Sequence, residues 1–273
     1  MSLAGRTVWV VGGVGVVGRG IARGLLQLGA TVIVNSRSPE RLTRIAKDLK
    51  YPERLVTVNG SLLPGKASDT VEEAMLNHNV DTLNHVVSHG AVRYWTTQKL
   101  GCDETFALGT ANVDLLDYTP EDFRRASSQL ATLHFSAAQE LIPHLMNSSA
   151  STGLPSSYTF VTGDGGGHPS TLRTAMGEIN THHVWGLSAA MRAQFASSDK
   201  IVCRELRVGL PVQEEDSETV CEDIGNLCAG IVTSAAKEGE NGRLVRIDDK
   251  KSLEALLAEY QAYSSFDDVA KTA

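Results

Sequence analysis

The strongest constraint on this chain is a set of three glycines, spaced three residues apart, between an apolar strand and an amphipathic helix. The strand is expected at Thr7 to Val11, the glycines are Gly12, Gly15 and Gly18, and the helix is expected from about Gly18 to Leu28. Glycine lets a backbone turn tightly and leaves its amides uncovered, and amides at the start of a helix bind anions. This order therefore predicts a Rossmann-type fold that binds a dinucleotide, and a purely structural glycine turn is the alternative.

The phosphates of that dinucleotide are expected at the glycine turn, where a side chain would block their approach. The turn residues that we assign to cofactor binding are Gly12, Gly13, Val14, Gly15, Val17 and Gly18.

The residues after the second expected strand, Thr31 to Val34, indicate which dinucleotide is bound. Proteins of this fold that use NAD(H) place a carboxylate there for the adenosine ribose, whereas this chain has Asn35, Ser36 and Arg37. No carboxylate would repel a 2′-phosphate, and the planar cation of Arg37 suits one. We therefore expect NADP(H) rather than NAD(H), contacted by these three residues and by Asn59. A solvated surface arginine is the alternative.

The rest of the chain alternates β-branched runs with amphipathic stretches, as repeated β-α-β units around a parallel sheet do. We expect a doubly wound α/β sheet formed by a single domain over residues 1–273. An irregular insertion at about 93–117 interrupts it, either as a surface excursion or as part of a substrate pocket, and a polar linker is expected at 148–157. The other expected strands are Arg54 to Val58, Leu83 to Ser88, Tyr158 to Thr162, Ile201 to Val208 and Leu244 to Ile247. The other expected helices are Pro39 to Leu49, Ala67 to Asn77, Pro120 to Leu145, Thr181 to Phe195, Glu222 to Ala236 and, at the C-terminus, Ser252 to Tyr260.

Charge and composition narrow the expected partners and location. A formal net charge of −7 argues against a nucleic-acid surface. The longest apolar run, Val8 to Val17, is too short to span a bilayer. The four cysteines show no metal-ligand spacing, and no signal peptide precedes them, so we expect reduced thiols in a cytoplasmic protein. Adjacent His182 and His183 diverge on a helix, so no metal site is expected.

The order of elements from Gly5 to Ile247 resembles the short-chain dehydrogenase/reductase family. The run Ser88 to Ala91 stands where that family has an Asn-Asn-Ala-Gly turn after its fourth strand, with only the glycine matching, and Val208–Gly209 stands where it has a Pro-Gly pair beside the nicotinamide. The resemblance implies a homodimer or homotetramer joined through the long helix and the helix after the fifth strand. The further cofactor contacts that it implies are His89, Gly90, Ala91 and Val208.

The family's catalytic Tyr-x-x-x-Lys pair is missing. In that pair the lysine lowers the pKa of the tyrosine, so that the phenol exchanges a proton with the substrate. Here no tyrosine has a lysine four residues later, and the expected window is Gly177 to Thr181. Gly163 stands at the serine position and Leu130 at the asparagine position of the long helix. These departures argue against the usual alcohol and ketone chemistry, but not against cofactor binding.

Asp164 and Thr162 are the candidate replacements for the missing acid. Asp164 stands near the start of the glycine-rich loop 163–167, which would lie over the nicotinamide. A buried Asp164 would have a raised pKa and could donate a proton, and an ionised one would stabilise a cationic acceptor such as an iminium. A loop-capping aspartate is the alternative, and His168 is a weaker candidate acid.

The sequence therefore predicts an NADP(H)-dependent oxidoreductase with a non-standard active site. It would transfer hydride to a carbonyl, an imine or an activated double bond of a small molecule. Two alternatives stay open. One is a catalytically inactive NADP(H)-binding regulator or sensor, and the other is a cofactor-scaffolded cyclase or isomerase.

Overall fold

Seven parallel strands form one sheet, in the order β3-β2-β1-β4-β5-β6-β7, in the computed structural model of the chain. The structure describes residues 2–78, 80–90, 115–163, 175–210 and 217–261. From β1 the next strands, β2 and β3, are added on one side, and β4 to β7 are added on the other, so the strand order reverses between β1 and β4. This is the doubly wound arrangement, and the predicted fold class is confirmed. The strands are β1 (Thr7–Val11), β2 (Thr31–Ser36), β3 (Leu55–Asn59), β4 (His85–Ser88), β5 (Ser156–Gly163), β6 (Ile201–Val208) and β7 (Leu244–Ile247).

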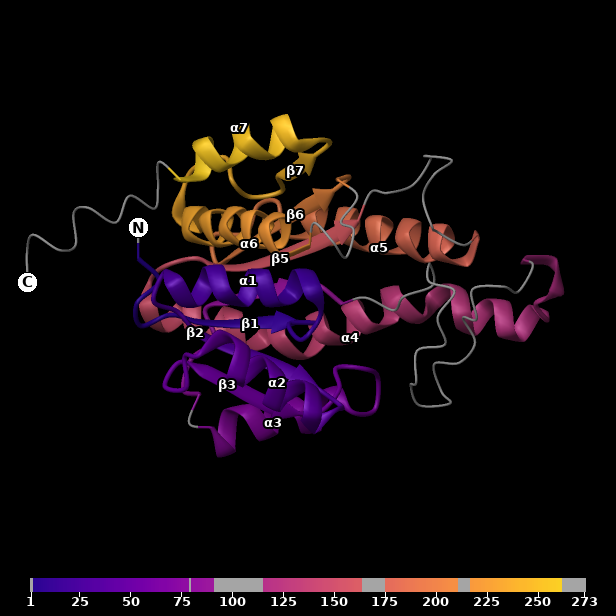
Figure 1. The fold of residues 1–273 in the computed structure, drawn as a ribbon, viewed down its shortest axis with the longest axis horizontal. Coiled ribbons are helices and arrows are strands. Elements are labelled where there is room, and N and C mark those ends of the chain that lie inside the picture. The colour runs from indigo at the N-terminus through magenta and orange to yellow at the C-terminus, as the bar shows by residue number, and fades with distance from the viewer. Residues whose placement is uncertain (1, 79, 91–114, 164–174, 211–216, 262–273) are drawn as a thin grey trace, which may run out of the picture.

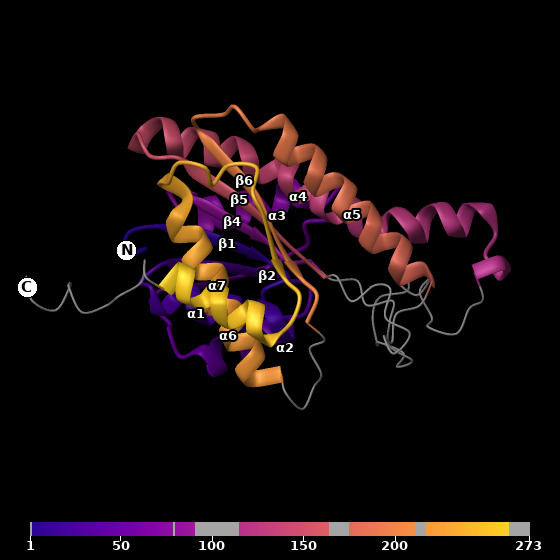
Figure 2. The same cartoon turned by 90° about the horizontal axis from the view of Figure 1, so that it is seen from above.

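Helices cover both faces of the sheet (Figures 1 and 2). One face packs against α1 (Val16–Gln27), α2 (Pro39–Leu49), α6 (Ser217–Thr233) and α7 (Lys250–Gln261). The other packs against α3 (Ala67–Asn77), α4 (Pro120–Thr152) and α5 (Ala175–Gln194). Two short 3₁₀ turns, η2 (Leu115–Asp117) and η3 (Ser234–Ala236), complete the described elements.

The central strands are apolar along their whole length because both of their faces are buried. In β1, Val8 and Val10 pack under α1 and α6, while Trp9 and Val11 pack under α3 and α4, and all four side chains are buried. Such strands give continuous β-branched runs rather than an alternating pattern, as is typical of parallel sheets. This is why the sequence revealed them clearly.

Helix α4 is longer than expected, and the prediction of a polar linker at 148–157 is wrong over most of its length. The last residue of α4 is Thr152, and Gly153 ends the helix in the left-handed conformation at φ 67°. Strand β5 already begins at Ser156. Ser148 is buried, and its hydroxyl accepts a hydrogen bond from the amide of Leu83 at 3.0 Å. The polar composition therefore reflects a helix face that bonds to the backbone, not a loop.

The expected insertion at 93–117 lies mostly outside the described residues, which resume at Leu115. Beyond it, α4 and α5 run side by side past the carboxyl edge of the sheet (Figures 1 and 2). Helix α5 starts six residues before its expected position at Thr181. Among the described helices, none is both long and apolar enough to cross a membrane.

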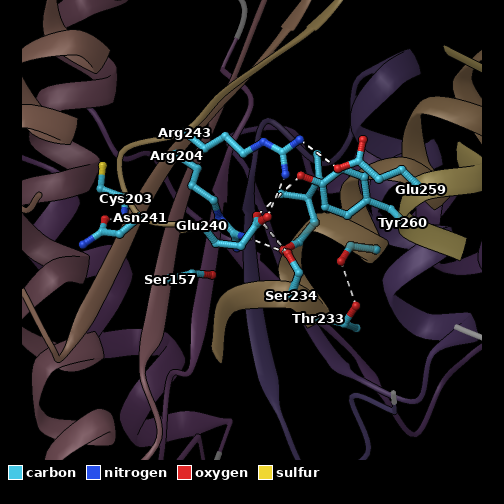
Figure 3. Close-up of polar contacts among 12 residues, drawn as sticks. Ser157, Cys203, Arg204, Thr233, Ser234, Glu240, Asn241, Arg243, Glu259 and Tyr260 are labelled. Carbon is cyan, nitrogen blue, oxygen red and sulfur yellow. Dashed lines mark hydrogen bonds and ion pairs between the residues drawn. The ribbon is translucent and has the colours of Figure 1, made fainter. Parts of the chain in front are cut away.

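A buried ion-pair cluster joins β6 to the segment that leads into the edge strand β7 (Figure 3). Arg204 is fully buried and lies 3.0 Å from the carboxylate of Glu240, which also receives a hydrogen bond from Arg243 at 2.8 Å. Burial raises the pKa of Glu240, but the hydrogen bonds from Arg243 and the charge of Arg204 outweigh it, so the carboxyl stays ionised. The hydroxyl of Ser234 donates to the same carboxylate at 3.1 Å. The cluster therefore fixes the loop before β7 against the core.

Candidate cofactor and active site

The glycine turn between β1 and α1 is packed by backbone on several sides. Gly12 has φ 74°, and a β-carbon there would lie 1.6 Å from the carbonyl oxygen of His89. A β-carbon on Gly18 would lie 2.2 Å from the carbonyl oxygen of Gly12. A β-carbon on Gly13 would lie 2.5 Å from a side-chain methyl group of Val34. These three glycines are therefore required by the fold itself.

Gly15 is different, because its surroundings are open. A β-carbon there would meet only the carbonyl oxygen of Gly12, at 3.4 Å, and its φ of −76° suits any residue. Gly15 is also the N-cap of α1, and as a glycine it has no side chain that could cap the helix. The first turn of α1, which the structure describes in full, contains no acidic residue. The first backbone donor within the helix is the amide of Arg19, to Gly15. The amides of the three helix residues before it, 16–18, are thus available to an anion.

The end of β2 is organised by Asn35. Its side-chain oxygen accepts a hydrogen bond from the indole of Trp9 at 3.1 Å, and its amide donates to the carbonyl of Gly60 at 3.3 Å. Asn35 therefore links three adjacent strands. The exposed Arg37 follows, next to the N-cap of α2, and Asn59 is exposed at the end of the neighbouring strand β3. The expected adenosine-side residues are brought together at one corner of the sheet.

The turn after β4 is held by a histidine of α4 that the sequence analysis did not single out. The ring of His134 lies 2.7 Å from the Ser88 hydroxyl through Nδ1, and 3.1 Å from the carbonyl oxygen of Gly90 through Nε2. Burial lowers the pKa of His134 to about 4, so the ring is neutral near pH 7. Because a carbonyl only accepts, we assign the proton to Nε2, and Ser88 then donates to Nδ1.

Near the carboxyl end of β5, Thr162 contacts the buried carboxylate of Glu205 on the neighbouring strand β6. The Thr162 hydroxyl donates to Glu205 at 2.8 Å, and Glu205 is fully buried. The other oxygen of Glu205 accepts from Ser188 at 2.8 Å, and the carboxylate also pairs with Arg207 at 2.7 Å and with Arg192 at 3.4 Å. The single hydroxyl proton of Thr162 is thus already donated to Glu205.

The helix α5 carries no tyrosine and no lysine in its sequence. In the window expected for the family's catalytic pair, the Thr181 hydroxyl donates to the carbonyl of Gly177 at 2.9 Å. Asn180 is buried and reaches into α4, where it accepts from the Leu130 amide at 3.3 Å and donates to the Ala126 carbonyl at 2.9 Å. The window therefore serves contact between the two helices rather than acid catalysis.

Several expected site residues lie outside the described part of the chain. These are Ala91, Asp164 and His168. Val208 is half-buried at the end of β6, beside Gly163 of β5. In the described part of the chain, no three histidine, cysteine, aspartate or glutamate side chains are grouped to hold a metal ion.

Glu205 and His134 are the two buried site residues that sequence reasoning missed. Glu205 had a visible signal, since it stands with Arg204 and Arg207 in a strand whose other residues are apolar, and buried charges are normally paired. His134 had none, because one histidine on a long helix is most simply interpreted as a surface or core residue. Its partners are 44 and 46 residues away.

A family described as "NADP oxidoreductase coenzyme F420-dependent" matches residues 7–80. A comparison with curated protein sequences gave no match.

Among solved structures, the Pseudomonas aeruginosa RhlG/NADP active-site complex is 18% identical, with a TM-score of 0.67 over 92% of this chain and 98% of its own. The 3-ketoacyl-(acyl-carrier-protein) reductase from Brucella melitensis, complexed with NADH, is 17% identical, with a TM-score of 0.67 over 92% and 100%. A short-chain type dehydrogenase/reductase from Mycobacterium marinum is 16% identical, with a TM-score of 0.65 over 90% and 94%. The chain therefore has the fold of the short-chain dehydrogenases/reductases over nearly its whole length.

Proposed function

We propose that this protein is an NADP(H)-dependent oxidoreductase that transfers hydride to a carbonyl, an imine or an activated double bond. The observation that carries the proposal is the glycine turn at the switch point of the sheet, with Gly15 open and no side chain of the described residues capping α1. A turn of this kind binds the pyrophosphate of a dinucleotide. The family match over residues 7–80, and the NADP held by one structural neighbour, support the same cofactor.

Three groups of residues would each bind a different part of the cofactor. The first amides of α1 would bind the pyrophosphate, Arg37 with Ser36 and Asn59 would bind the adenosine 2′-phosphate side, and the turn at His89 and Gly90 would line the nicotinamide side. Bound there, NADPH supplies a hydride at the carboxyl edge of β4 and β5. Asp164 would supply the proton or stabilise a cationic acceptor, with Thr162 as its polar neighbour.

The test is a titration of the purified protein with NADPH and NADH, followed by a turnover assay with carbonyl and imine substrates. NADPH should bind more tightly than NADH, and Asp164→Asn should lose turnover while keeping NADPH binding. Tight binding without turnover of any substrate would favour the regulator or sensor. Conversion of a substrate without net oxidation of NADPH would favour the cyclase or isomerase.

We also propose that a second copy of this chain covers the outer faces of α4 and α5. Phe135 is 51% exposed on α4, and small exposed residues, Gly186 and Ala189, lie on the neighbouring α5. Large exposed apolar side chains beside such a surface favour self-association. A dimer or tetramer in light scattering that Phe135→Glu dissociates is the expected result, and a monomeric wild-type protein would refute it.

A further inference from the structure

The turn after β4 is the part of the candidate cofactor site that depends on a distant helix. The turn begins at His89, whose amide donates a hydrogen bond to the carbonyl of Val11 at 3.0 Å. The carbonyl of His89 fills the space where Gly12 would carry a β-carbon. The turn after β4 and the glycine turn between β1 and α1 are therefore in direct backbone contact, and a shift of one moves the other.

His134 contacts this turn at two points. Its ring accepts from Ser88 at 2.7 Å and donates to Gly90 at 3.1 Å, and the residue is 1% exposed. The carbonyl of His134 itself accepts from the hydroxyl of Tyr158 at 3.4 Å, and its ring packs near Phe160. Residue 134 is thus contacted from β5, at its carbonyl and at its ring, as well as from β4.

Helix α4 also presses on the same turn through an apolar contact. A β-carbon on Gly90 would lie 2.8 Å from Leu133, the residue before His134. The position of Gly90 is therefore determined by α4 from two directions, by contact with Leu133 and by the hydrogen bond from His134. No charge is involved, since the ring is neutral.

We propose that His134 is a positioning residue for NADP(H), and that it acts by holding Ser88 and Gly90 at the distance from Gly12 that the dinucleotide requires. This inference rests on the proposed function. Because His134 is buried, we do not expect it to touch the cofactor. Its effect should therefore appear in the dissociation constant and KM for NADPH, with a much smaller effect on kcat.

Three variants separate the two contacts. His134→Gln can place an amide donor near the position of Nε2 and keep the bond to Gly90. His134→Asn can place an acceptor near Nδ1 and keep the bond to Ser88. His134→Leu keeps neither. Because one hydrogen bond is worth about 1 kcal/mol and tenfold in binding is about 1.4, we expect NADPH to bind about fivefold more weakly or worse to the Asn and Leu variants. The Gln variant should restore most of the affinity.

His85 is the matched control. It lies at the other end of β4, is buried, and makes the same kind of bond, from Nδ1 to the hydroxyl of Ser157 at 2.9 Å. His85→Leu should lower the unfolding temperature to a similar extent as His134→Leu and leave the dissociation constant of NADPH unchanged. Ser88→Ala, which removes only the hydroxyl that bonds to His134, gives a second measurement.

The outcomes are distinct. If wild-type protein binds no NADPH, the proposed function fails, whatever the variants do. If wild-type protein binds NADPH, and His134→Leu and Ser88→Ala bind it with wild-type affinity below their unfolding temperatures, the positioning role is overturned. The same holds if His85→Leu weakens NADPH binding as much as His134→Leu, because the effect would then be loss of stability alone.

Discussion

The hydroxyl of Thr162 donates its only proton to the buried carboxylate of Glu205, across 2.8 Å. Glu205 is fully buried between β6 and α5, and Arg192 and Arg207 balance its charge. Thr162, which the sequence suggested as a candidate for the missing acid, is therefore part of a buried structural cluster. Towards a ligand, Thr162 can act only as a hydrogen-bond acceptor.

Substitutions of Thr162 test this assignment. Thr162→Ser should keep the bond to Glu205 and near-wild-type kcat. Thr162→Val should cost about 1–2 kcal/mol of unfolding free energy, because Glu205 loses one donor, and should leave NADPH binding unchanged. Denaturant unfolding and steady-state kinetics measure both. A loss of turnover of more than about a thousandfold in Thr162→Val, the size expected when a proton-transfer group is removed, would contradict the acceptor role.

Gly12 and Gly15 should separate folding from cofactor binding. Gly12→Ala combines a positive φ with a β-carbon 1.6 Å from the His89 carbonyl, so it should cost more than about 3 kcal/mol. Gly15→Ala should fold normally, but its methyl group would stand where the pyrophosphate approaches. We expect NADPH to bind at least about tenfold more weakly, as measured by fluorescence titration. Unchanged binding in Gly15→Ala would place the phosphates elsewhere.

Arg37 should decide between the two dinucleotides. Arg37→Ala should weaken NADPH by roughly ten- to a hundredfold, since a charge-assisted bond is worth about 1.5–3 kcal/mol, and should change NADH little. Arg44→Ala removes another exposed cation, within α2, and serves as the control. Equal losses for NADPH and NADH in Arg37→Ala would remove this residue from the 2′-phosphate site.

Acid should destabilise the fold through His85 and His134. Burial lowers their pKa values to about 3 and about 4, so both stay neutral in the folded chain while the unfolded chain takes up protons below about pH 6.5. Their contribution is therefore complete above that pH and is lost as the pH falls, by about 2 kcal/mol per histidine between pH 7 and pH 5. Urea unfolding at both values measures this loss. In His134→Leu the dependence should become shallower, and an unchanged slope would contradict the buried neutral state.

The cluster around Glu240 should matter for stability alone. Glu240→Gln leaves the fully buried Arg204 without its counter-charge and should cost about 3–5 kcal/mol. Glu259→Gln removes a more exposed partner of Arg243 and should cost less than about 1 kcal/mol. Thermal unfolding compares the two variants. If they are equally stable, the ion pair of Arg204 contributes little.

The amino-acid sequence determined the architecture, because the signals for it are local. The β-branched runs, the capped helix starts and the turn from Gly12 to Gly18 each lie within a few residues, so strand, turn and helix could be assigned in order. The missing Tyr-x-x-x-Lys pair was also visible. The polar end of α4 was not, since the serines near Ser148 satisfy backbone groups of other elements, which composition cannot show.

Tertiary structure decided what the buried polar residues do. Thr162 meets Glu205, His134 meets Ser88 and Gly90, and Asn180 meets Leu130 only because parallel strands and their helices bring together positions 43 to 50 residues apart. No periodicity encodes such pairs. Burial then fixes their charge and proton positions, because a neutral ring or a paired carboxylate is the form that a water-free interior stabilises.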